Sequence, residues 1–534
     1  MAAAAGRRHS DPPWSSALRV CAGAAVLLLA LVAVGPVQAA GFAPSPRLAA
    51  LLGAKGPDGS ALVGTEAREY FDSLPVRAQE LFDAAVEKEF VSEPEHLRQI
   101  LSLRLPAGQL ELFLHDNCAL CHTDPATQEP ETLFSIDPAA TGSPAHLDLR
   151  EFVSDVHFRR GLSCAGCHGG KPTDEEMPDE VYDRWPETAL RHKDRSWIPG
   201  FCARCHADPE FMRGFDPAMA TDQYAKYQKS QHGIRLLGQH DDKAAQCVSC
   251  HGAHGIRGAR SPNSRVHPKR LPYTCGECHA DARYMAGYRL ADGHPLPVDQ
   301  LAEFEKSVHG RALLERGDLG APACNDCHGN HAALPPATSS IAEVCRTCHS
   351  QEGEQFDGSK HKEAFERAGW PECAKCHGNH AIAKAEDSML DEKSSPLCYD
   401  CHREHAKPST QCIETARHFS KSIATLARET NELGGRVSDL AERGLDPDPL
   451  SSTVEDLHET LRQARTRIHT FDRGEFDQVV LRGREANAQG RQLLEDAEAE
   501  YRFRLRGLGL AVGVMAVLGL LLYLKIREID GRTK

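Results

Sequence analysis

Nine Cys-X-X-Cys-His motifs are the part of this sequence whose residue types and spacing could do chemistry. In each motif two thiols stand three residues apart, and a histidine follows the second thiol directly. Thiolates and imidazoles both bind transition metals, and a thiol can also bond covalently to a cofactor. The motifs use 18 of the 20 cysteines and are Cys118/Cys121/His122, Cys164/Cys167/His168, Cys202/Cys205/His206, Cys247/Cys250/His251, Cys275/Cys278/His279, Cys324/Cys327/His328, Cys345/Cys348/His349, Cys373/Cys376/His377 and Cys398/Cys401/His402.

The spacing within the motif favours haem over zinc and over disulfides. Two thiols three residues apart reach the two vinyl groups on one edge of a haem, and the adjacent histidine then lies under the ring as the proximal iron ligand. Zinc sites also use paired cysteines, but they do not require a histidine directly after every pair. If the cysteine pairs formed disulfides, the nine adjacent histidines would have no role. We therefore expect nine covalently bound c haems, each with the motif histidine as one iron ligand.

Histidines outside the motifs recur at fixed distances from them. His232 and His309 each precede the first cysteine of the next motif by 15 residues, and His361 precedes Cys373 by 12 residues. The motif after each of these histidines continues as Cys-His-Gly-X-His, and another motif begins 21 to 28 residues later. This pattern indicates an internal repeat with two haems per unit.

The second histidine of Cys-His-Gly-X-His lies one turn after the proximal histidine, on the same side of its own haem. It cannot reach the opposite face of that iron, so we expect it to bind the iron of a neighbouring haem. The candidate distal ligands are therefore His232, His254, His309, His331, His361 and His380, together with His157, seven residues before Cys164. Further candidates, which no repeat supports, are His115, His405, His418 and His469.

Over residues 115–402 the chain resembles the doubled-CxxCH multihaem cytochromes c of bacterial respiration. The resemblance implies a mostly helical, loop-rich haem domain with two histidine ligands on each iron. It also implies electron transfer between a membrane quinol pool and periplasmic or extracellular acceptors. The C-terminal helices are somewhat similar to those of the multihaem nitrite reductase and hydroxylamine oxidoreductase group, which leaves an enzymatic function open.

The elements that must position these motifs indicate a mainly α protein. Residues 41–113 form a helical lead-in, in which Leu48, Leu51, Phe82, Leu97, Ile100 and Leu101 are spaced among charged residues. Residues 114–410 hold the motifs and show no sustained apolar period, so this domain is too poor in apolar side chains to fold without cofactors. We expect short helices and loops that pack on the haems.

Residues 411–505 are predicted to form a helical bundle. The first apolar seam runs from Ala416 to Leu440 with alternating spacings of three and four, and the sequence GLDPDP at 444–449 breaks it. The second seam runs from Val454 to Ile468. The third comprises Phe476, Val479, Gly483, Ala486, Leu493 and Ala497. Such seams are typical of an antiparallel bundle and also of self-association, so a homo-oligomer through these helices stays open.

Two apolar segments place the chain at a membrane. Residues 1–40 have the basic, apolar and small-residue regions of a cleavable signal peptide. Gly507–Leu524 is free of charge over 18 residues, which is enough for a transmembrane helix, and 525–534 form a short basic tail. The signal peptide predicts that 41–505 lie on the periplasmic face of a bacterial cytoplasmic membrane and that the tail stays in the cytoplasm.

The charge and the motifs together limit the function. A formal net charge of -14 argues against nucleic acid as a partner, because phosphate binding needs a basic face. The leading hypothesis is an electron carrier whose irons all have two histidine ligands, with a membrane quinol oxidoreductase and periplasmic cytochromes as redox partners. The alternative is a reductase that acts on a small nitrogen or sulfur compound at one five-coordinate haem. No motif reads CxxCK, so a lysine-ligated active haem has no match here.

Overall fold

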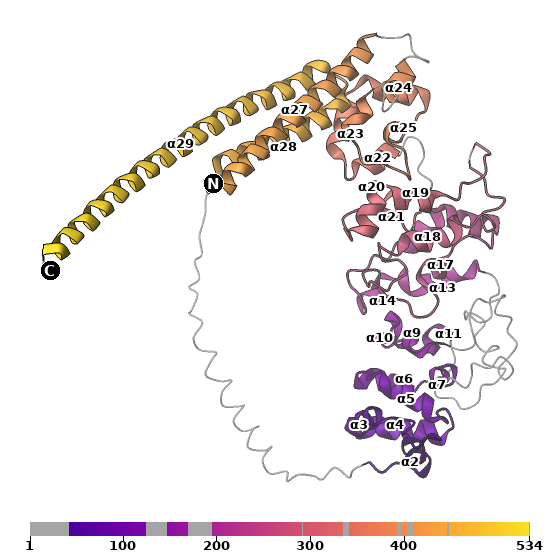
Figure 1. Ribbon diagram of the computed structural model, residues 1–534. Coiled ribbons are helices and arrows are strands. Elements are labelled where there is room, and N and C mark those ends of the chain that lie inside the picture. Colours follow the sequence, from indigo (N-terminus) through magenta and orange to yellow (C-terminus); the bar gives the residue numbers. More distant parts are fainter. Residues whose placement is uncertain are drawn as a thin grey trace, which may run out of the picture. The chain divides into compact units, whose positions relative to one another are not determined.

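The computed structural model describes residues 42–123, 147–168, 195–290, 292–334, 341–391, 397–402, 410–445 and 448–532 (Figure 1). These residues form helices, turns and two isolated bridge pairs, and they contain no strand, so the expected mainly α class is confirmed. The predicted signal peptide lies outside the described residues. The chain divides into two compact units, Met1–Trp197 with Ala253–Arg257, and Ile198–Gly252 with Gly258–Lys534.

The first unit begins with a helical lead-in around a well-filled apolar core. Leu48, Phe82, Leu97, Ile100 and Leu101 are completely buried, as their spacing predicts. Pairs of phenylalanine rings pack edge to face inside the core, a geometry that aromatic rings favour. The helices are α2 (Pro46–Leu52), α3 (Thr65–Ser73), α4 (Val76–Glu87), α5 (Pro94–Ser102) and α6 (Ala107–Leu114).

The same core continues past the lead-in and supports the first two motifs. Leu120, Phe152 and Phe158 are buried in it, and the Phe152 and Phe158 ring centres lie 4.9 Å apart. The first two motifs are therefore built on well-packed protein. The helices concerned are α7 (Asn117–His122), α9 (Leu149–Val153), α10 (Val156–Arg159) and α11 (Cys164–His168).

The second unit carries the other seven motifs on short helices with little apolar packing of their own. Between 198 and 402 the described residues form one small apolar cluster, around Tyr227, Leu236 and Ala244. This agrees with a domain whose core is completed by cofactors. Its helices are α13 (Trp197–His206), α14 (Pro209–Arg213), α15 (Gln223–Lys229), α16 (Gln231–Gly233), η2 (Ile234–Gly238), α17 (Cys247–His251), α18 (Leu271–His279), α19 (Gln300–Lys306), α20 (Val308–Gly310), η3 (Arg311–Glu315), α21 (Cys324–His328), α22 (Ile341–Arg346), α23 (Ser350–Asp357), α24 (Lys360–Ala368), α25 (Glu372–His377), η4 (Asp387–Leu390) and α26 (Leu397–Asp400).

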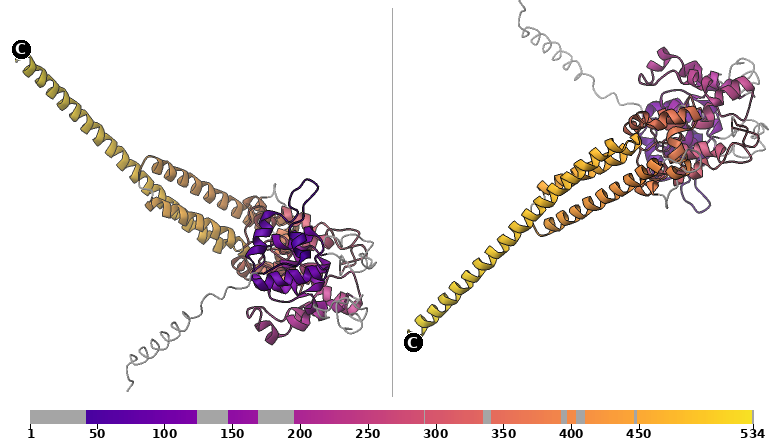
Figure 2. Two further views of the ribbon diagram at one scale, coloured as in Figure 1. Left: turned by 90° about the horizontal axis from the view of Figure 1, so that it is seen from below. Right: turned by 90° about the horizontal axis from the view of Figure 1, so that it is seen from above.

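A bundle of three long helices follows in the same unit. Both views of Figure 2 show α27 (Thr410–Glu442) and α28 (Asp448–Arg467) lying against α29 (Arg473–Arg532), which continues beyond them. Every position of the first predicted seam, from Ala416 to Leu440, is buried. In the third seam the choice of Leu493 was wrong, because Leu493 is 44% exposed whereas Leu494 is completely buried.

The last part of α29 differs from the rest of the bundle. Its apolar side chains between Leu508 and Leu524 are all exposed. Among the described residues, α29 is the one helix that is long and apolar enough to cross a membrane. This supports a C-terminal membrane anchor at the predicted segment Gly507–Leu524.

Candidate haem-binding site

Most CxxCH motifs lie within one short helix. Cys247–His251 and Cys324–His328 are each one complete short helix, and Glu372–His377 adds one residue before its motif. Residues three and four apart share one face of a helix. Both thiols and the imidazole of such a motif therefore face the same side, as covalent attachment to one haem requires.

The second cysteine of a motif lies inside its helix in seven of the nine cases. Cys121 belongs to α7, Cys167 to α11 and Cys278 to α18. The thiol-bearing residue is exposed at Cys167 and half-buried at Cys278, so burial does not follow a common pattern among the second cysteines. The other members of this group are Cys205, Cys250, Cys327 and Cys376.

The second cysteine falls outside the α-helix in the remaining two motifs, although Cys401 lies in a π-helical turn directly after α26. Cys348 is exposed and lies in the turn between α22 and α23, and Cys401 is half-buried and follows the last residue of α26. In the first of these motifs the carbonyl of Cys345 still accepts from Cys348 N at 3.2 Å and from His349 N at 2.9 Å. The motif thus keeps one helical turn although its helix has ended. Covalent attachment of haem to Cys348 and Cys401 stays a prediction, as it does for the other motif cysteines.

A glycine directly after the proximal histidine ends three of these helices. Gly252, Gly329 and Gly378 have φ of 84°, 78° and 76°, a left-handed conformation that glycine adopts without strain. The turn releases the next residues from the helix, so the second histidine of Cys-His-Gly-X-His leaves the face of the first. Asn330 and Asn379 then accept the backbone N–H of His331 and His380 through their Oδ1 atoms, at 2.6 and 2.7 Å.

Seven pairs of histidine rings face one another at nearly the same separation in the described residues. The ring centres lie between 5.9 and 6.2 Å apart in every pair. Each pair joins one motif histidine to one histidine outside the motifs. The pairs are His168 with His254, His279 with His232, His251 with His331, His349 with His309, His328 with His380, His402 with His361, and His377 with His469.

This separation fits an iron held between two imidazoles. A metal–imidazole bond is about 2 Å long, and the ring centre lies roughly 1 Å behind the bonding nitrogen. Two such ligands on opposite faces of one metal therefore have ring centres about 6 Å apart. Two imidazoles in direct contact without a metal have no reason to keep this one value in all seven pairs.

The pairs follow a simple order along the chain. Each second histidine of a Cys-His-Gly-X-His motif meets the proximal histidine of an earlier motif, as His331 meets His251 and His380 meets His328. Each upstream histidine meets the second motif of its own repeat, as His309 meets His349. Histidine pairs therefore link the two motifs within one repeat and also link each repeat to an earlier motif.

The two kinds of pair differ in the angle between their rings. Where the partner comes from a Cys-His-Gly-X-His motif, the planes lie within 8 to 29° of each other. Where the partner is an upstream histidine, the planes are 45 to 80° apart, and the largest angle belongs to His361 and His402. The angle between ligand planes is a property that iron spectroscopy detects.

A Ser-X-His-Gly turn positions two of the histidines that precede their motifs, His232 and His309. Ser307 Oγ donates to Phe304 O at 2.6 Å and accepts from Gly310 N at 2.9 Å, which caps the turn that carries His309. A Cβ on Gly310 would lie 1.9 Å from Phe304 O, so no other residue fits there. A π-helical turn, η3, follows directly, and such turns are frequent at functional sites.

The same arrangement repeats around His232. Ser230 Oγ donates to Tyr227 O at 2.6 Å and accepts from Gly233 N at 2.9 Å. A Cβ on Gly233 would lie 2.0 Å from Tyr227 O. The π-helical turn η2 follows here too. The identical geometry of the two copies confirms that they are structural repeats.

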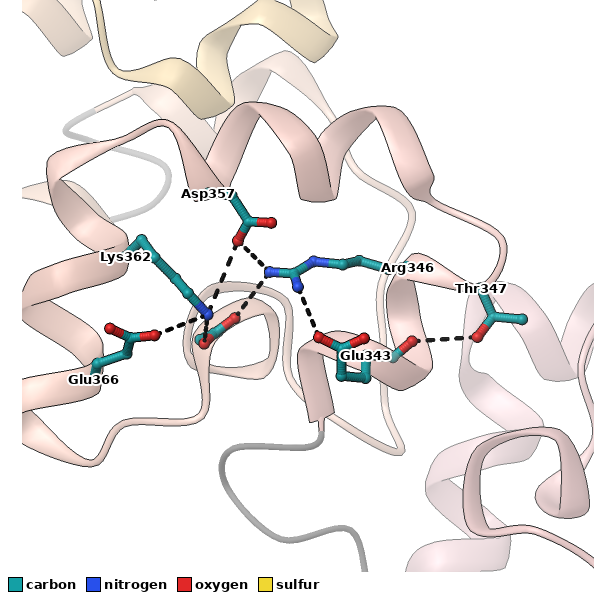
Figure 3. A network of polar contacts seen from close by, with 7 residues as sticks. Glu343, Arg346, Thr347, Asp357, Lys362 and Glu366 are labelled. Atoms are coloured by element: carbon teal, nitrogen blue, oxygen red, sulfur yellow. Dashed lines mark hydrogen bonds and ion pairs between the residues drawn. The ribbon is translucent and has the colours of Figure 1, made fainter.

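The third copy replaces the glycine by Lys362, which belongs to an ion-pair network (Figure 3). Lys362 Nζ lies 2.6 Å from Glu372 Oε1, and Arg346 Nη2 lies 3.5 Å from the other oxygen of the same carboxylate. Both cations also contact Asp357. The side chain of Glu372 is only 5% exposed, so the network joins α22, α23, α24 and α25 around one buried carboxylate.

Burial sets the protonation of the paired histidines. It lowers the pKa of His168, His232 and His361 to about 4 in each case. Burial also lowers the pKa of further members of the pairs, namely His251, His254, His279, His309, His331, His377 and His380. These rings are therefore neutral at pH 7, and the neutral imidazole is the form that binds metal.

Thiols of successive motifs lie against one another. The thiols of three pairs of successive motifs lie close enough to shift each other's pKa, and these pairs are Cys202 with Cys247, Cys275 with Cys324, and Cys345 with Cys373. In the first unit, Asp116 joins two motifs, because its carboxylate accepts from Ala119 N at 3.1 Å and from Cys164 N at 3.0 Å. The cofactor-attachment edges of neighbouring motifs are thus brought together.

The remaining sequence candidates have other surroundings. His157 Nδ1 lies 3.1 Å from Asp155 Oδ1, His115 is exposed, and His418 contacts Asp477. His405 lies outside the described residues. His122 and His206 are not members of the seven pairs, and the segments 124–146 and 169–194 beside them also lie outside the described residues.

His469 is the member of the pairs for which the sequence offered the weakest support. It has no counterpart in the repeat, and it lies in η6 (Ile468–Thr470), the short turn between α28 and α29. One signal was present in the sequence. The third Cys-His-Gly-X-His motif has no later copy to supply a partner for His377, so its partner had to come from elsewhere in the chain.

Comparison with known proteins bears on two of the nine motifs. A family described as "Doubled CXXCH motif" matches residues 366–407, which include the motifs of His377 and His402. No curated protein and no solved structure matches the chain. The matched motif is consistent with a multihaem c-type cytochrome and indicates covalently bound haem c and electron transfer.

Proposed function

We propose that this chain is a membrane-anchored cytochrome that holds nine covalent haems and passes electrons along them. The observation that carries the proposal is the set of seven histidine pairs with ring centres about 6 Å apart. The motif histidine and its partner would bind opposite faces of one iron, and the two motif cysteines would hold the porphyrin edge. A bound haem supplies one-electron oxidation and reduction of its iron.

The pairs favour a carrier over a catalytic site. A reductase needs an iron with an open position for its substrate. Both positions would be filled by protein at the irons of the seven pairs. Short capped turns hold His232 and His309, and a buried ion-pair network lies beside His361, which would keep the surroundings of these irons similar in both oxidation states. Small rearrangement between the two states is what rapid electron exchange requires.

The order of the motifs supports a continuous electron path. The thiol contacts between successive motifs would bring the attached edges of neighbouring porphyrins together. The Cys-His-Gly-X-His motifs add a second link, because His328 and His331 serve two different irons from one short turn. Electrons would therefore pass between haems whose ligands are joined by a few residues of backbone.

The anchor bears on the choice of partner. α29 runs as one helix from Arg473, beside the His469 turn, through Gly507, where the apolar segment begins. These 34 residues span about 50 Å at about 1.5 Å per residue. The His377 and His402 motifs would thus lie far along the helix from the bilayer, so the electron donor or acceptor at this end is a protein domain rather than quinol itself. A membrane quinol oxidoreductase and periplasmic cytochromes fit this requirement.

The location follows from the predicted signal peptide together with this anchor. We place the haem-binding part on the periplasmic face of a bacterial cytoplasmic membrane, where c haems are attached. The formal net charge of -14 favours soluble partners with a basic docking face.

Haem count and carbon monoxide binding test the proposal. The full chain, produced with a cytochrome c maturation system, should show nine haem additions by intact mass, and its dithionite-reduced form should bind no carbon monoxide. Fewer than eight haems would contradict the count. Carbon monoxide binding by the unaltered protein would support the reductase alternative instead.

A further inference from the structure

We propose that the helical bundle supplies His469 as the distal ligand of the iron held by the His377 motif. The inference rests on the assignment of haem to the motifs above. It gives the bundle a second role, because the bundle then completes a redox site as well as connecting it to the anchor. Displacement of the bundle would open that iron.

The ring geometry places His469 with the other distal candidates. Its ring centre lies 6.2 Å from that of His377, and the two planes differ by 30°. Both values are close to those of His254 with His168, and the separation equals that of His331 with His251; these two pairs come from the repeats. In those cases a later Cys-His-Gly-X-His motif supplies the partner. The chain ends its repeats at His380, and the bundle provides the ring in place of a fourth repeat.

The turn that carries His469 orients its ring for ligation. His469 Nδ1 lies 2.9 Å from Thr466 O, so Nδ1 carries the proton and donates it to this carbonyl. Nε2 is then the unprotonated nitrogen, available for a metal, as in most metal-binding histidines with a backbone acceptor. Phe471, with φ of 53°, reverses the chain after the turn. Its ring centre lies 3.8 Å from that of His361, so the same turn also packs on a second ligand.

Three polar contacts dock this end of the bundle on the haem-binding helices. Arg465 binds both oxygens of Asp387 through Nε and Nη2, each at 2.8 Å. Thr466 Oγ1 donates to Glu352 Oε1 at 3.0 Å, and Arg467 Nη1 donates to Gln355 Oε1 at 2.8 Å. All three residues precede His469 by two to four positions. The contacts therefore hold the ligand turn in place from α23 and η4.

Substitution of His469 tests the assignment on the full-length, haem-loaded chain. His469→Ala should keep the wild-type haem count and convert one iron to high spin, which electron paramagnetic resonance detects. The reduced variant should bind one equivalent of carbon monoxide, and added imidazole should restore the low-spin spectrum. His458→Ala, an exposed histidine on α28, is the matched control and should leave the spectrum unchanged.

A charge reversal tests whether docking holds the ligand. Arg465→Asp places two carboxylates together and should raise carbon monoxide binding at one iron, and Asp387→Arg in the same chain should reverse the effect. A haem-loaded His469→Ala protein that stays entirely low-spin would overturn this inference and leave the proposed function intact. Unaltered carbon monoxide binding in Arg465→Asp would overturn the role of docking. A wild-type chain without covalent haem would overturn the proposed function itself.

Discussion

His328 and His331 stand three residues apart in one motif, yet their rings face two different partners. His328 lies opposite His380, with ring centres 5.9 Å apart, and His331 lies opposite His251 at 6.2 Å. The glycine between them, with φ of 78°, ends the helix and separates the two directions. One short turn therefore contributes to two histidine pairs, which link it to two different repeats.

Removing His331 should open one iron without loss of haem. In His331→Ala the cysteines and proximal histidines of every motif remain, so the haem count by intact mass should equal that of the wild type. The iron of His251 loses its distal ligand, becomes high-spin and binds carbon monoxide when reduced. His294→Ala, at an exposed position, is the control. A fully low-spin His331→Ala protein would mean that His331 is not a ligand.

Gly233→Ala should disturb the His232 turn much more than a neighbouring glycine substitution does. Its Cβ would meet Tyr227 O at 2.0 Å, so the turn must move, at a cost of about 2 kcal/mol in the free energy of unfolding. The shift moves His232 away from His279. The iron proposed to lie between these two histidines should therefore become high-spin in a fraction of the molecules. Gly238→Ala meets nothing within 4 Å and is the control. Equal thermal unfolding temperatures and spectra of the two variants would contradict the tight turn.

Lys362→Met should destabilise the haem-binding helices α22 to α25. Glu372 is buried and would keep Arg346, at 3.5 Å, as its nearest remaining cation. Breaking a largely buried ion pair from one side costs about 2 kcal/mol or more, since the buried carboxylate loses its closest cation. Lys360→Met, two residues earlier and exposed, is the control. Thermal unfolding followed by haem absorbance should separate the two variants, and an unchanged Lys362→Met curve would argue against the network.

Asp155→Asn should weaken the attachment of the segment that carries His254, in a pH-dependent way. Asp155 Oδ1 accepts from His157 N at 2.7 Å, and Oδ2 accepts from Ile256 N at 2.8 Å. Burial alone would raise the pKa of Asp155, but the hydrogen bonds from His157 and Ile256 outweigh it and lower the pKa overall. We expect a loss of about 1–3 kcal/mol at pH 7 in the variant, because one buried N–H loses a charged acceptor.

The sign of the pH dependence follows from the lowered pKa of Asp155. Its contribution to stability is fully present above the pKa of the unfolded chain, about 3.9, and is lost as the pH falls through the lower folded value. The difference in unfolding temperature between wild type and Asp155→Asn should therefore be larger at pH 7 than at pH 3. A difference that is the same at both pH values would show that the ionised carboxylate is not responsible.

The sequence was sufficient to predict most of the site because its geometry is local. The CxxCH turns need only a helical spacing, and the offsets of His232, His309 and His361 repeat along the chain. His469 could not be assigned in the same way, because its pairing with His377 depends on how a separate bundle docks. Leu494 was missed because the buried positions before it, Asn487 and Gly490, carry no apolar side chain, so the apolar pattern led to Ala486 and Leu493 instead.

Electron paramagnetic resonance of the oxidised, full-length protein tests the central claim most directly. The structure predicts low-spin irons of two kinds. Nearly parallel ligand planes, such as those of His251 and His331 at 8°, should give rhombic signals. Steeply crossed planes, such as those of His361 and His402 at 80°, should give the large-g signals typical of perpendicular imidazoles. Both kinds together, with no high-spin iron among the seven pairs, is the predicted result. High-spin iron at three or more equivalents per chain would contradict the account, because at most two irons lie outside these pairs.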